Sequence, residues 1–147
     1  MPVHSNSYRV GDLIDIGDDK VKCSVITSVN SVIVTVHIRV PTKEGTDDIY
    51  TYPISIWSVK GVRINEFLLK TMGFEKSDKM DNRWTLFLPL KGMVCLDPLS
   101  NKEGTEYCVH VDNLMGCTIG TLDVHFIHQI QHIIADTLDF EFVIKVV

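Results

Sequence analysis

The sequence predicts one α+β domain over residues 1–147, with an antiparallel curved sheet or partial barrel, one short central helix and one longer C-terminal helix. Three observations support this prediction. The chain of 147 residues has the size of one ordinary domain. Several short segments alternate apolar and polar residues, which is the pattern of strands with one wet face. Two other segments repeat their apolar residues at helical spacing.

Four strands with tight turns are expected in the first part of the chain, at residues 10–15, 20–28, 32–40 and 49–57. A turn is expected after the first of them, at Gly17 to Asp19. The third strand has the clearest alternation, with one apolar face of Val32, Val34, Val36, Ile38 and Val40 and an opposite face of Ile33, Thr35, His37 and Arg39. Pro53 has no backbone donor, so the fourth strand is expected at an edge or a bulge.

The central helix is expected over residues 65–72. Asn65 is a typical N-cap, Gly73 suits the left-handed position that ends a helix, and Phe74 follows to pack on the last turn. Further strands are expected at 84–90, 93–96, 105–111 and 139–146. In the first of these Leu90 shares a face with Trp84, and Pro89 again indicates an edge.

The late helix is expected from an N-cap at Asp123 through residues 124–138. At about 100° per residue one broad arc is apolar, and its members are Phe126, Ile127, Ile130, Ile133, Ile134 and Leu138. His125, His128 and His132 fall on the opposite side. The sequence therefore places all three histidines on a polar face.

These histidines could form a metal site, a pH-sensitive cluster or a solvated helix face. Imidazole is a common metal ligand, and Asp136 lies one turn beyond His132. The segment lacks the HExxH arrangement that identifies a helical zinc site. We therefore favour the solvated face and assign no metal-ligating residue.

Four cysteines are expected to remain thiols in a reducing cytoplasm. Their spacing is irregular, and the nearest local zinc candidate is Cys108 with His110 and Cys117 downstream. Buried small apolar side chains are the favoured interpretation. Two pairs of residues are candidates for a nucleophile and its base. They are Cys108 with His110 and Asp112 with His128.

Composition argues against several classes of partner. The formal net charge is −5 and the 14 basic residues are scattered, which argues against nucleic acid as a partner. No apolar run approaches the roughly 20 residues that span a bilayer, and the first residues show no secretion signal. No membrane partner and no cofactor are expected, and the protein is expected in a cytoplasm.

The tetrapeptide Lys-Glu-Gly-Thr occurs twice, at residues 43–46 and 102–105. A duplicated strand-loop-strand-helix unit would explain the repeat, and so would two solvated turns. The surrounding residues barely match, so the two turns are favoured.

The opening strand, the central helix that closes on Gly73-Phe74 and the late histidine-glutamine helix together resemble a family of small uncharacterised proteins. Phages and mobile elements of gut Bacteroidetes-type bacteria encode this family. Leu68, Leu69, Lys70, Gly73 and Phe74 match its central motif, with one additional residue before Gly73, and His128, Gln129, Ile130 and Gln131 match its late motif. The resemblance implies no catalytic residue. It points to His128, Gln129 and Gln131 as a polar binding strip, although capping of neighbouring backbone groups explains them equally well.

We therefore expect a non-enzymatic protein-interaction or structural module of a phage or mobile element, such as a virion or assembly component. It would bind a protein partner or itself through strand edges and through Tyr50, Tyr52, Trp57 and Trp84. A protein that sequesters a small ligand through His37, Arg39 and Arg63 is the alternative, and a metal-dependent enzyme comes third. The expected location is the cytoplasm of the bacterial host, with incorporation into the virion as a further option.

Overall fold

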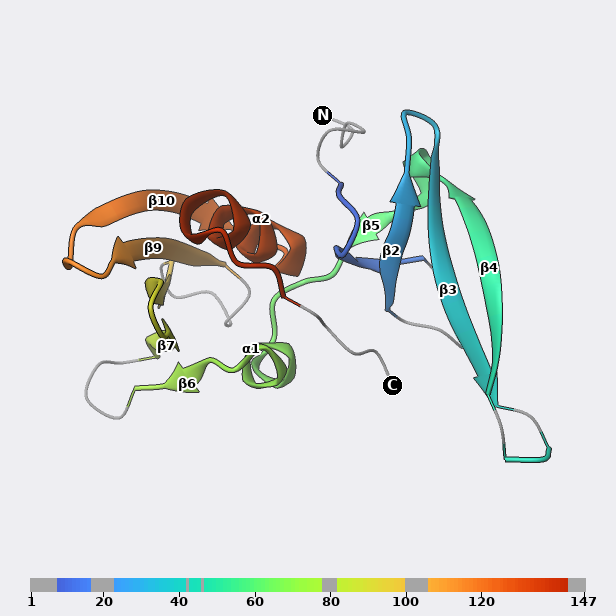
Figure 1. Cartoon of the computed structure of the whole chain (residues 1–147), viewed down its shortest axis with the longest axis horizontal. Helices are drawn as coiled ribbons and strands as arrows, with labels where there is room; N and C mark the ends of the chain where they lie inside the picture. The colour runs from blue at the N-terminus through green and yellow to red at the C-terminus, as the bar shows by residue number, and fades with distance from the viewer. Residues whose placement is uncertain are drawn as a thin grey trace. The chain divides into compact units, whose positions relative to one another are not determined.

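The computed structural model describes residues 8–16, 23–41, 43–45, 47–77, 82–99 and 106–142. They divide into two compact units, the first ending at Val62 and the second running from Arg63 to Phe142. Each unit contains an antiparallel five-stranded sheet (Figure 1). The α+β class with antiparallel sheets, a short central helix and a longer late helix is confirmed, and the strands form two sheets where one was expected.

Unit 1 has the strand order β4-β3-β2-β1-β5. Its elements are β1 (Leu13–Asp15), β2 (Ser24–Val29), β3 (Ile33–Pro41), β4 (Asp47–Ser55), the 3-10 turn η2 (Ile56–Ser58) and β5 (Lys60–Gly61). The four predicted strands are present with shorter or shifted bounds, and the two-residue β5 was not predicted. The turn expected at residues 17–19 lies outside the described residues.

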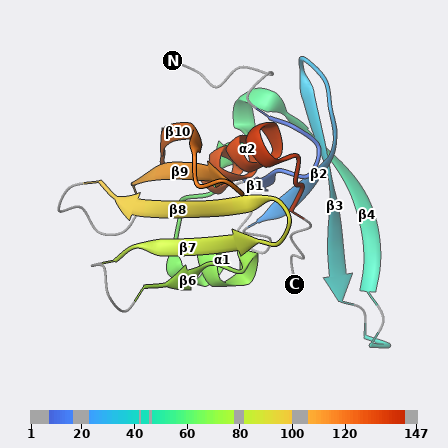
Figure 2. The same cartoon turned by 60° about the vertical axis from the view of Figure 1, so that its left-hand side comes forward.

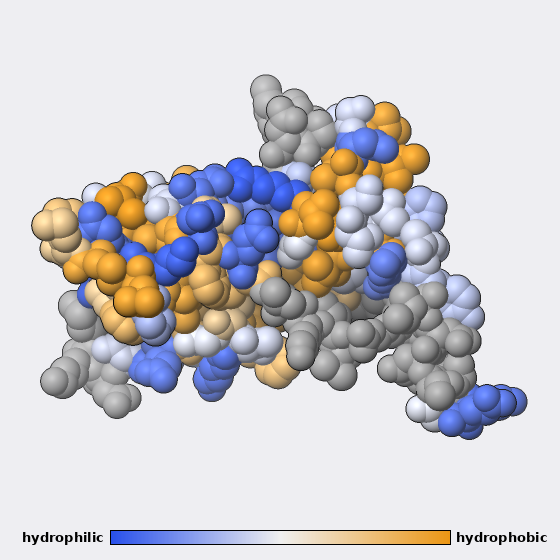
Figure 3. Space-filling view, in the orientation of Figure 1, coloured by the Kyte–Doolittle hydropathy of each residue, from blue (hydrophilic) through white to orange (hydrophobic). Residues whose placement is uncertain are grey.

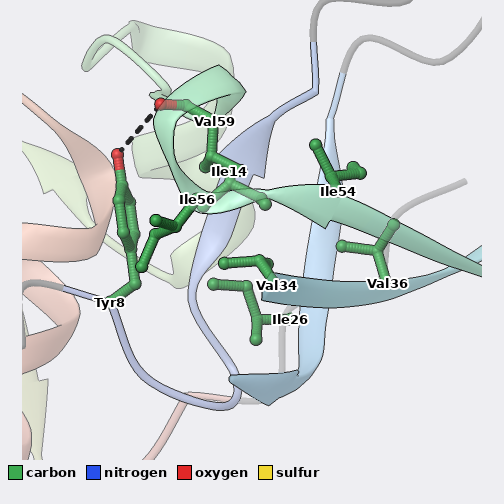
Figure 4. Close-up of a cluster of buried hydrophobic side chains, with 8 residues drawn as sticks. All are labelled: Tyr8, Ile14, Ile26, Val34, Val36, Ile54, Ile56 and Val59. Atoms are coloured by element: carbon green, nitrogen blue, oxygen red, sulfur yellow. Dashed lines mark hydrogen bonds between the residues drawn. The ribbon is translucent and has the colours of Figure 1, made fainter. Parts of the chain in front are cut away.

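The core of unit 1 forms on one face of its sheet. Val34 and Val36 are fully buried, whereas Ile33 and His37 are exposed, so the alternation predicted for β3 is confirmed over these residues. Val32, expected on the buried face, is 58% exposed because it precedes the strand. Figure 4 shows the buried cluster, which consists of Tyr8, Ile14, Ile26, Val34, Val36, Ile54, Ile56 and Val59.

Pro53 lies on an edge strand, as predicted. In the described residues β4 pairs with β3 alone, and Pro53 stands opposite Thr35. The amide of Ile56 donates to the carbonyl of Val32 at 2.8 Å, and such directly opposed bonds recur at every second position of an antiparallel ladder. Counting back from Ile56, the nitrogen of Pro53 points to the open side, where a missing N–H costs the sheet nothing.

Unit 2 has the strand order β10-β9-β8-β7-β6 (Figure 2). Its elements are α1 (Glu66–Met72), β6 (Glu75–Lys76), β7 (Trp84–Leu88), β8 (Gly92–Pro98), β9 (Tyr107–Asn113), β10 (Thr118–Val124) and α2 (Ile127–Leu138). Trp84, Leu86, Val94, Val109 and Val111 are buried on one face of the sheet. The helix α2 packs against β9 and β10.

The predicted ends of α1 are confirmed. The side-chain oxygen of Asn65 accepts from the amide of Leu68 at 2.9 Å, which satisfies one of the unpaired donors of the first turn. Gly73 has φ of 100°, the left-handed conformation that glycine adopts without steric cost. Phe74 is buried, and its amide donates to the carbonyl of Leu69 at 2.9 Å. Local sequence therefore determines this helix.

The expected start of α2 is wrong. Asp123 and Val124 belong to β10, where Val124 pairs with Tyr107, and the N-cap of α2 is Phe126. The strand β10 was not predicted from the sequence. Strand pairing holds these residues extended, so the helix begins three residues later than helical spacing alone suggests.

Two further expectations differ from the structure. Leu90 was expected on a strand face with Trp84, but β7 ends at Leu88 and Leu90 has φ of 65° in the following turn. Pro89 lies in the same turn and not on an edge strand. Residues 139–142 are not a strand, and the rest of the strand expected at 139–146 lies outside the described residues.

The repeated tetrapeptide is described in part. Lys43 to Gly45 form an exposed turn, while Thr46 and residues 102–105 lie outside the described residues. The duplication hypothesis stays a prediction.

Two compact units can unfold together as one domain or separately as two. The single domain over 1–147 therefore stays a prediction. The two tryptophans test it, because Trp57 lies in unit 1 and is exposed, while Trp84 is buried in unit 2. In Trp57→Phe, fluorescence reports on Trp84 alone and far-UV circular dichroism reports on both sheets. We expect the two signals to share one urea midpoint. Separate midpoints would show two domains.

Candidate functional site

Aromatic rings stack along the start of α2. The rings of Phe126 and His128 are stacked at 5.7 Å between centroids with 12° between planes. His132 meets His128 edge-on at 5.5 Å, and the guanidinium of Arg63 lies 5.9 Å from the centre of the Phe126 ring. We call Arg63, Phe126, His128 and His132 the ring row.

Backbone pairing brings Arg63 to this row. Arg63 and Phe126 form an isolated antiparallel bridge, and the amide of Ile64 donates to the carbonyl of His125 at 3.4 Å. The segment before α1 therefore runs beside the segment before α2. A cation over an aromatic face is attracted by the ring quadrupole, which favours the position of Arg63. This contact was not predicted, because the two segments lie about 60 residues apart and no local pattern links them.

The prediction that His128 lies on an exposed polar face is wrong. Its side chain is 4% exposed, and that of Gln131 is 7% exposed. The buried residues of α2 are Ile127, His128, Ile130, Gln131, Ile134 and Leu138. This arc is centred near Ile127 and Leu138, so it extends to His128 and leaves Ile133 half-buried. The binding role of His128 and Gln131 stays a prediction, and it would require a side chain of α2 to become accessible.

Gln129 caps the helix. Its side-chain oxygen accepts from the amide of His125 at 2.8 Å and from that of Phe126 at 3.0 Å. These donors precede the first turn, where no carbonyl of α2 can reach them. The structure thus assigns Gln129 the capping role that the sequence left open, which is half of a capping box.

The histidine segment also approaches a carboxylate. Nδ1 of His125 lies 3.5 Å from Oε1 of Glu106. Among the described residues, no group of three or more His, Cys, Asp or Glu side chains is arranged to hold a metal ion. Asp136, the carboxylate considered for such a site, is exposed.

A second polar cluster lies on the sheet of unit 2. Sγ of Cys108 is 3.7 Å from Nε2 of His110, and the same nitrogen is 3.5 Å from Oδ2 of Asp97. Arg83 donates two hydrogen bonds to Asp97. Its Nε donates to Oδ1 at 2.6 Å, and its Nη2 donates to Oδ2 at 3.0 Å. The β8–β9 register, which pairs Asp97 with Cys108, creates this group. From sequence only Cys108 and His110 could be named.

The cluster lacks the properties of a thiol active site. Burial raises the pKa of the Cys108 thiol, and its hydrogen bond to Asp123 and that residue's charge raise the pKa further. A catalytic cysteine needs a lowered pKa, because the thiolate is the nucleophile. Moreover, Cys108 and Asp97 approach the same nitrogen of His110, whereas an orienting carboxylate binds the other nitrogen of the base.

The other nucleophile-base pair considered from sequence is not formed. Asp112 accepts a hydrogen bond from the hydroxyl of Thr118 at 2.8 Å. The preceding residue, Val111, pairs with Gly120, and Gly120 lies against Thr137 of α2. Because neighbouring strand residues point to opposite faces, Asp112 faces away from α2 and from His128.

Of the four aromatic side chains considered for partner contacts, the exposed ones lie in unit 1. Tyr50, Tyr52 and Trp57 are 53%, 49% and 66% exposed. Trp84, named with them as a contact residue, is 1% exposed and belongs to the core of unit 2. Three of the four aromatic side chains considered for partner contacts are therefore accessible.

No family model, curated protein or solved structure matches the chain. Within the described residues, no helix is both long enough and apolar enough to cross a membrane.

Removing the Gln129 cap is expected to destabilise the protein. Gln129→Ala leaves the amides of His125 and Phe126 without their acceptor and should cost about 1 kcal/mol of unfolding free energy in urea titrations. Gln129→Glu keeps an oxygen at this position and places negative charge near a helix N-terminus, so it should preserve stability. An unchanged midpoint in Gln129→Ala would contradict the capping role.

The Cys108 thiol is expected to titrate above the ordinary range of cysteine. In a variant with the other three cysteines replaced by serine, the pH profile of alkylation by iodoacetamide should have its midpoint above that of a free thiol. Asp123→Asn should lower the midpoint, because the negative charge of Asp123 helps to raise the pKa of Cys108. A midpoint below that of a free thiol would restore the catalytic interpretation.

Proposed function

We propose that this protein is a non-enzymatic protein-interaction or structural module of a phage or mobile element, such as a virion or assembly component. The observation that carries the proposal is the tyrosine face, which we define as Tyr50 and Tyr52 on β4. Both side chains are about half exposed although they lie on the apolar face of their sheet.

The register of β3 and β4 defines this face. Tyr52 pairs with Val36 and Ile54 pairs with Val34, so Tyr52 points to the same side as three core residues. Tyr50 follows two positions further from the core and points the same way. The apolar face thus extends beyond the buried cluster as two neighbouring tyrosines. Tyrosine is enriched in protein interfaces because its ring buries a large area and its hydroxyl keeps a polar contact.

Contact through side chains fits β4 better than addition of a strand. The open edge of β4 offers backbone groups to a partner strand, but the nitrogen of Pro53 points outward and donates nothing. A partner strand would lose a hydrogen bond in the middle of the pairing. We infer that the partner packs on the tyrosine face.

The chemistry of unit 2 supports binding over catalysis. The raised pKa of Cys108 keeps its thiol protonated near neutral pH, and Asp97 approaches the same nitrogen of His110 as that thiol does. The phage or mobile-element origin rests on the sequence resemblance. With it we propose the bacterial host cytoplasm as the location, with incorporation into the virion as the more specific form.

The sequestering alternative has less support from the structure. His37 is exposed on β3, whereas Arg63 belongs to unit 2 and lies over Phe126. The side chain of Arg39 lies outside the described residues. Binding of a small ligand to these residues stays a prediction.

The tyrosine face is tested by co-expression with the products of the neighbouring genes, followed by gel filtration with light scattering. We expect a complex of defined mass that the double variant Tyr50→Ser, Tyr52→Ser weakens at least tenfold, since buried interface tyrosines each contribute about 2 kcal/mol. His37→Ser is the matched control, because His37 is exposed on the opposite face of the same hairpin. A complex that tolerates the double variant would refute the tyrosine face as its binding surface.

A further inference from the structure

Five apolar side chains are exposed at one end of the unit 2 sheet. They are Phe87, Leu90, Leu114, Met115 and Ile119, with exposures of 65%, 88%, 61%, 88% and 43%. We call this group the apolar end. Figure 3 shows apolar surface at the left of the view, where Figure 1 places the turn between β9 and β10.

The apolar end is formed by two adjoining turns. The β7–β8 turn is closed by the pair Leu88 and Gly92, and Gly92 also pairs with Asn113, the last residue of β9 before the β9–β10 turn. A Cβ at Gly92 would collide with the carbonyl oxygen of Asp112. The two hairpins are therefore held in close contact, and their turns project from the same end of the sheet.

Hydrogen bonds hold both turns in shape. The side-chain oxygen of Asn113 accepts from the amides of Met115 and Cys117, each at 3.0 Å. In the other turn the amide of Lys91 donates to the carbonyl of Leu88 at 3.0 Å. Such local bonds reduce the entropy that a binding partner would otherwise have to remove. The apolar side chains are thus presented by preorganised backbone.

Leucine is an unfavourable residue at position 90. Its φ of 65° is in the left-handed region, where glycine or asparagine costs less free energy than a branched side chain. At 88% exposure the side chain gains little from packing within the chain. Both the backbone conformation and the exposure to solvent disfavour leucine at this position. We therefore expect the Leu90 side chain to contact another molecule.

The size of the apolar end fits one side of a dimer. Taking about 150–200 Å² for each fully exposed side chain of this size, the five leave roughly 600 Å² accessible. This sum equals the upper end of the range for the largest apolar patch of a typical monomer, and it approaches the roughly 800 Å² that each partner buries in a standard interface. Flanking turn atoms supply the remaining area.

We infer that a second copy of this chain docks on the apolar end, with the two ends packed against each other about a two-fold axis. An apolar patch is self-complementary, as an isologous contact requires. The chain carries a net charge of −5, so contact between copies is easiest where acidic groups are few. The two turns contain one charged residue, Lys91, whose Nζ already donates to the carbonyl of Asp139 at 3.1 Å.

A second copy of the chain is thus one partner of the proposed interaction module, and this inference rests on that proposal. The two surfaces lie in different units, the tyrosine face in unit 1 and the apolar end in unit 2. Loss of one contact can therefore be measured while the other is retained.

Leu90→Gly separates binding from folding. It removes the exposed side chain and relieves the left-handed strain, so the dilute monomer should unfold at a temperature a few degrees higher. Dimerisation, measured by sedimentation velocity from about 1 to 200 µM, should nevertheless weaken at least tenfold. Met115→Ser in the adjacent turn should weaken it similarly. Phe67→Ser is the control, because Phe67 is 77% exposed on α1 and lies outside the apolar end.

A monomeric wild-type chain at 200 µM would overturn the inference, as would a dimer unaffected by Leu90→Gly or equally weakened by Phe67→Ser. A dimer retained by the Tyr50→Ser, Tyr52→Ser variant is expected. If that dimer forms while no other protein binds the tyrosine face, the heterologous partner proposed above is refuted and the present inference stands.

Discussion

The pairing of β10 with β9 is the constraint on which the candidate site depends. The register runs from Thr118 opposite Asp112 to Val124 opposite Tyr107, and it holds the chain extended up to the start of α2. Because the strand ends at Val124, His125 and Phe126 form the link into the helix, and Arg63 pairs beside them. A helix that began at Val124 would place all of these side chains differently.

The same constraint explains the structural role of Gln129. A helix that follows directly from a strand has unpaired amides at its start, and Gln129 satisfies two of them from within the first turn. His128 is then buried within the ring row, where Phe126 and His132 cover two sides of its imidazole. Gln129, which belongs to a possible binding strip in the sequence, thus completes the start of the helix.

The two surfaces proposed for contact arise in different ways. The tyrosine face is an extension of a core-forming strand pattern, so its residues could be named from sequence. The apolar end depends on the β8–β9 register, which places two turns side by side although Leu90 and Met115 are 25 positions apart. A single exposed apolar residue in a turn is ordinary, whereas five exposed apolar residues at one end of a sheet are unusual.

The sequence by itself determined the local features. The α+β class, the capped helix α1, the alternation of β3 and the edge position of Pro53 all follow from spacings of a few residues, because caps, turns and pleats are short-range. Tertiary structure decided the rest. The division into two sheets, the strand β10, the burial of His128 and the approach of Asp97 to Cys108 and His110 depend on strand register and on which helix arc faces the sheet. Those choices are set by packing between segments that are distant in the chain, and no local pattern encodes them.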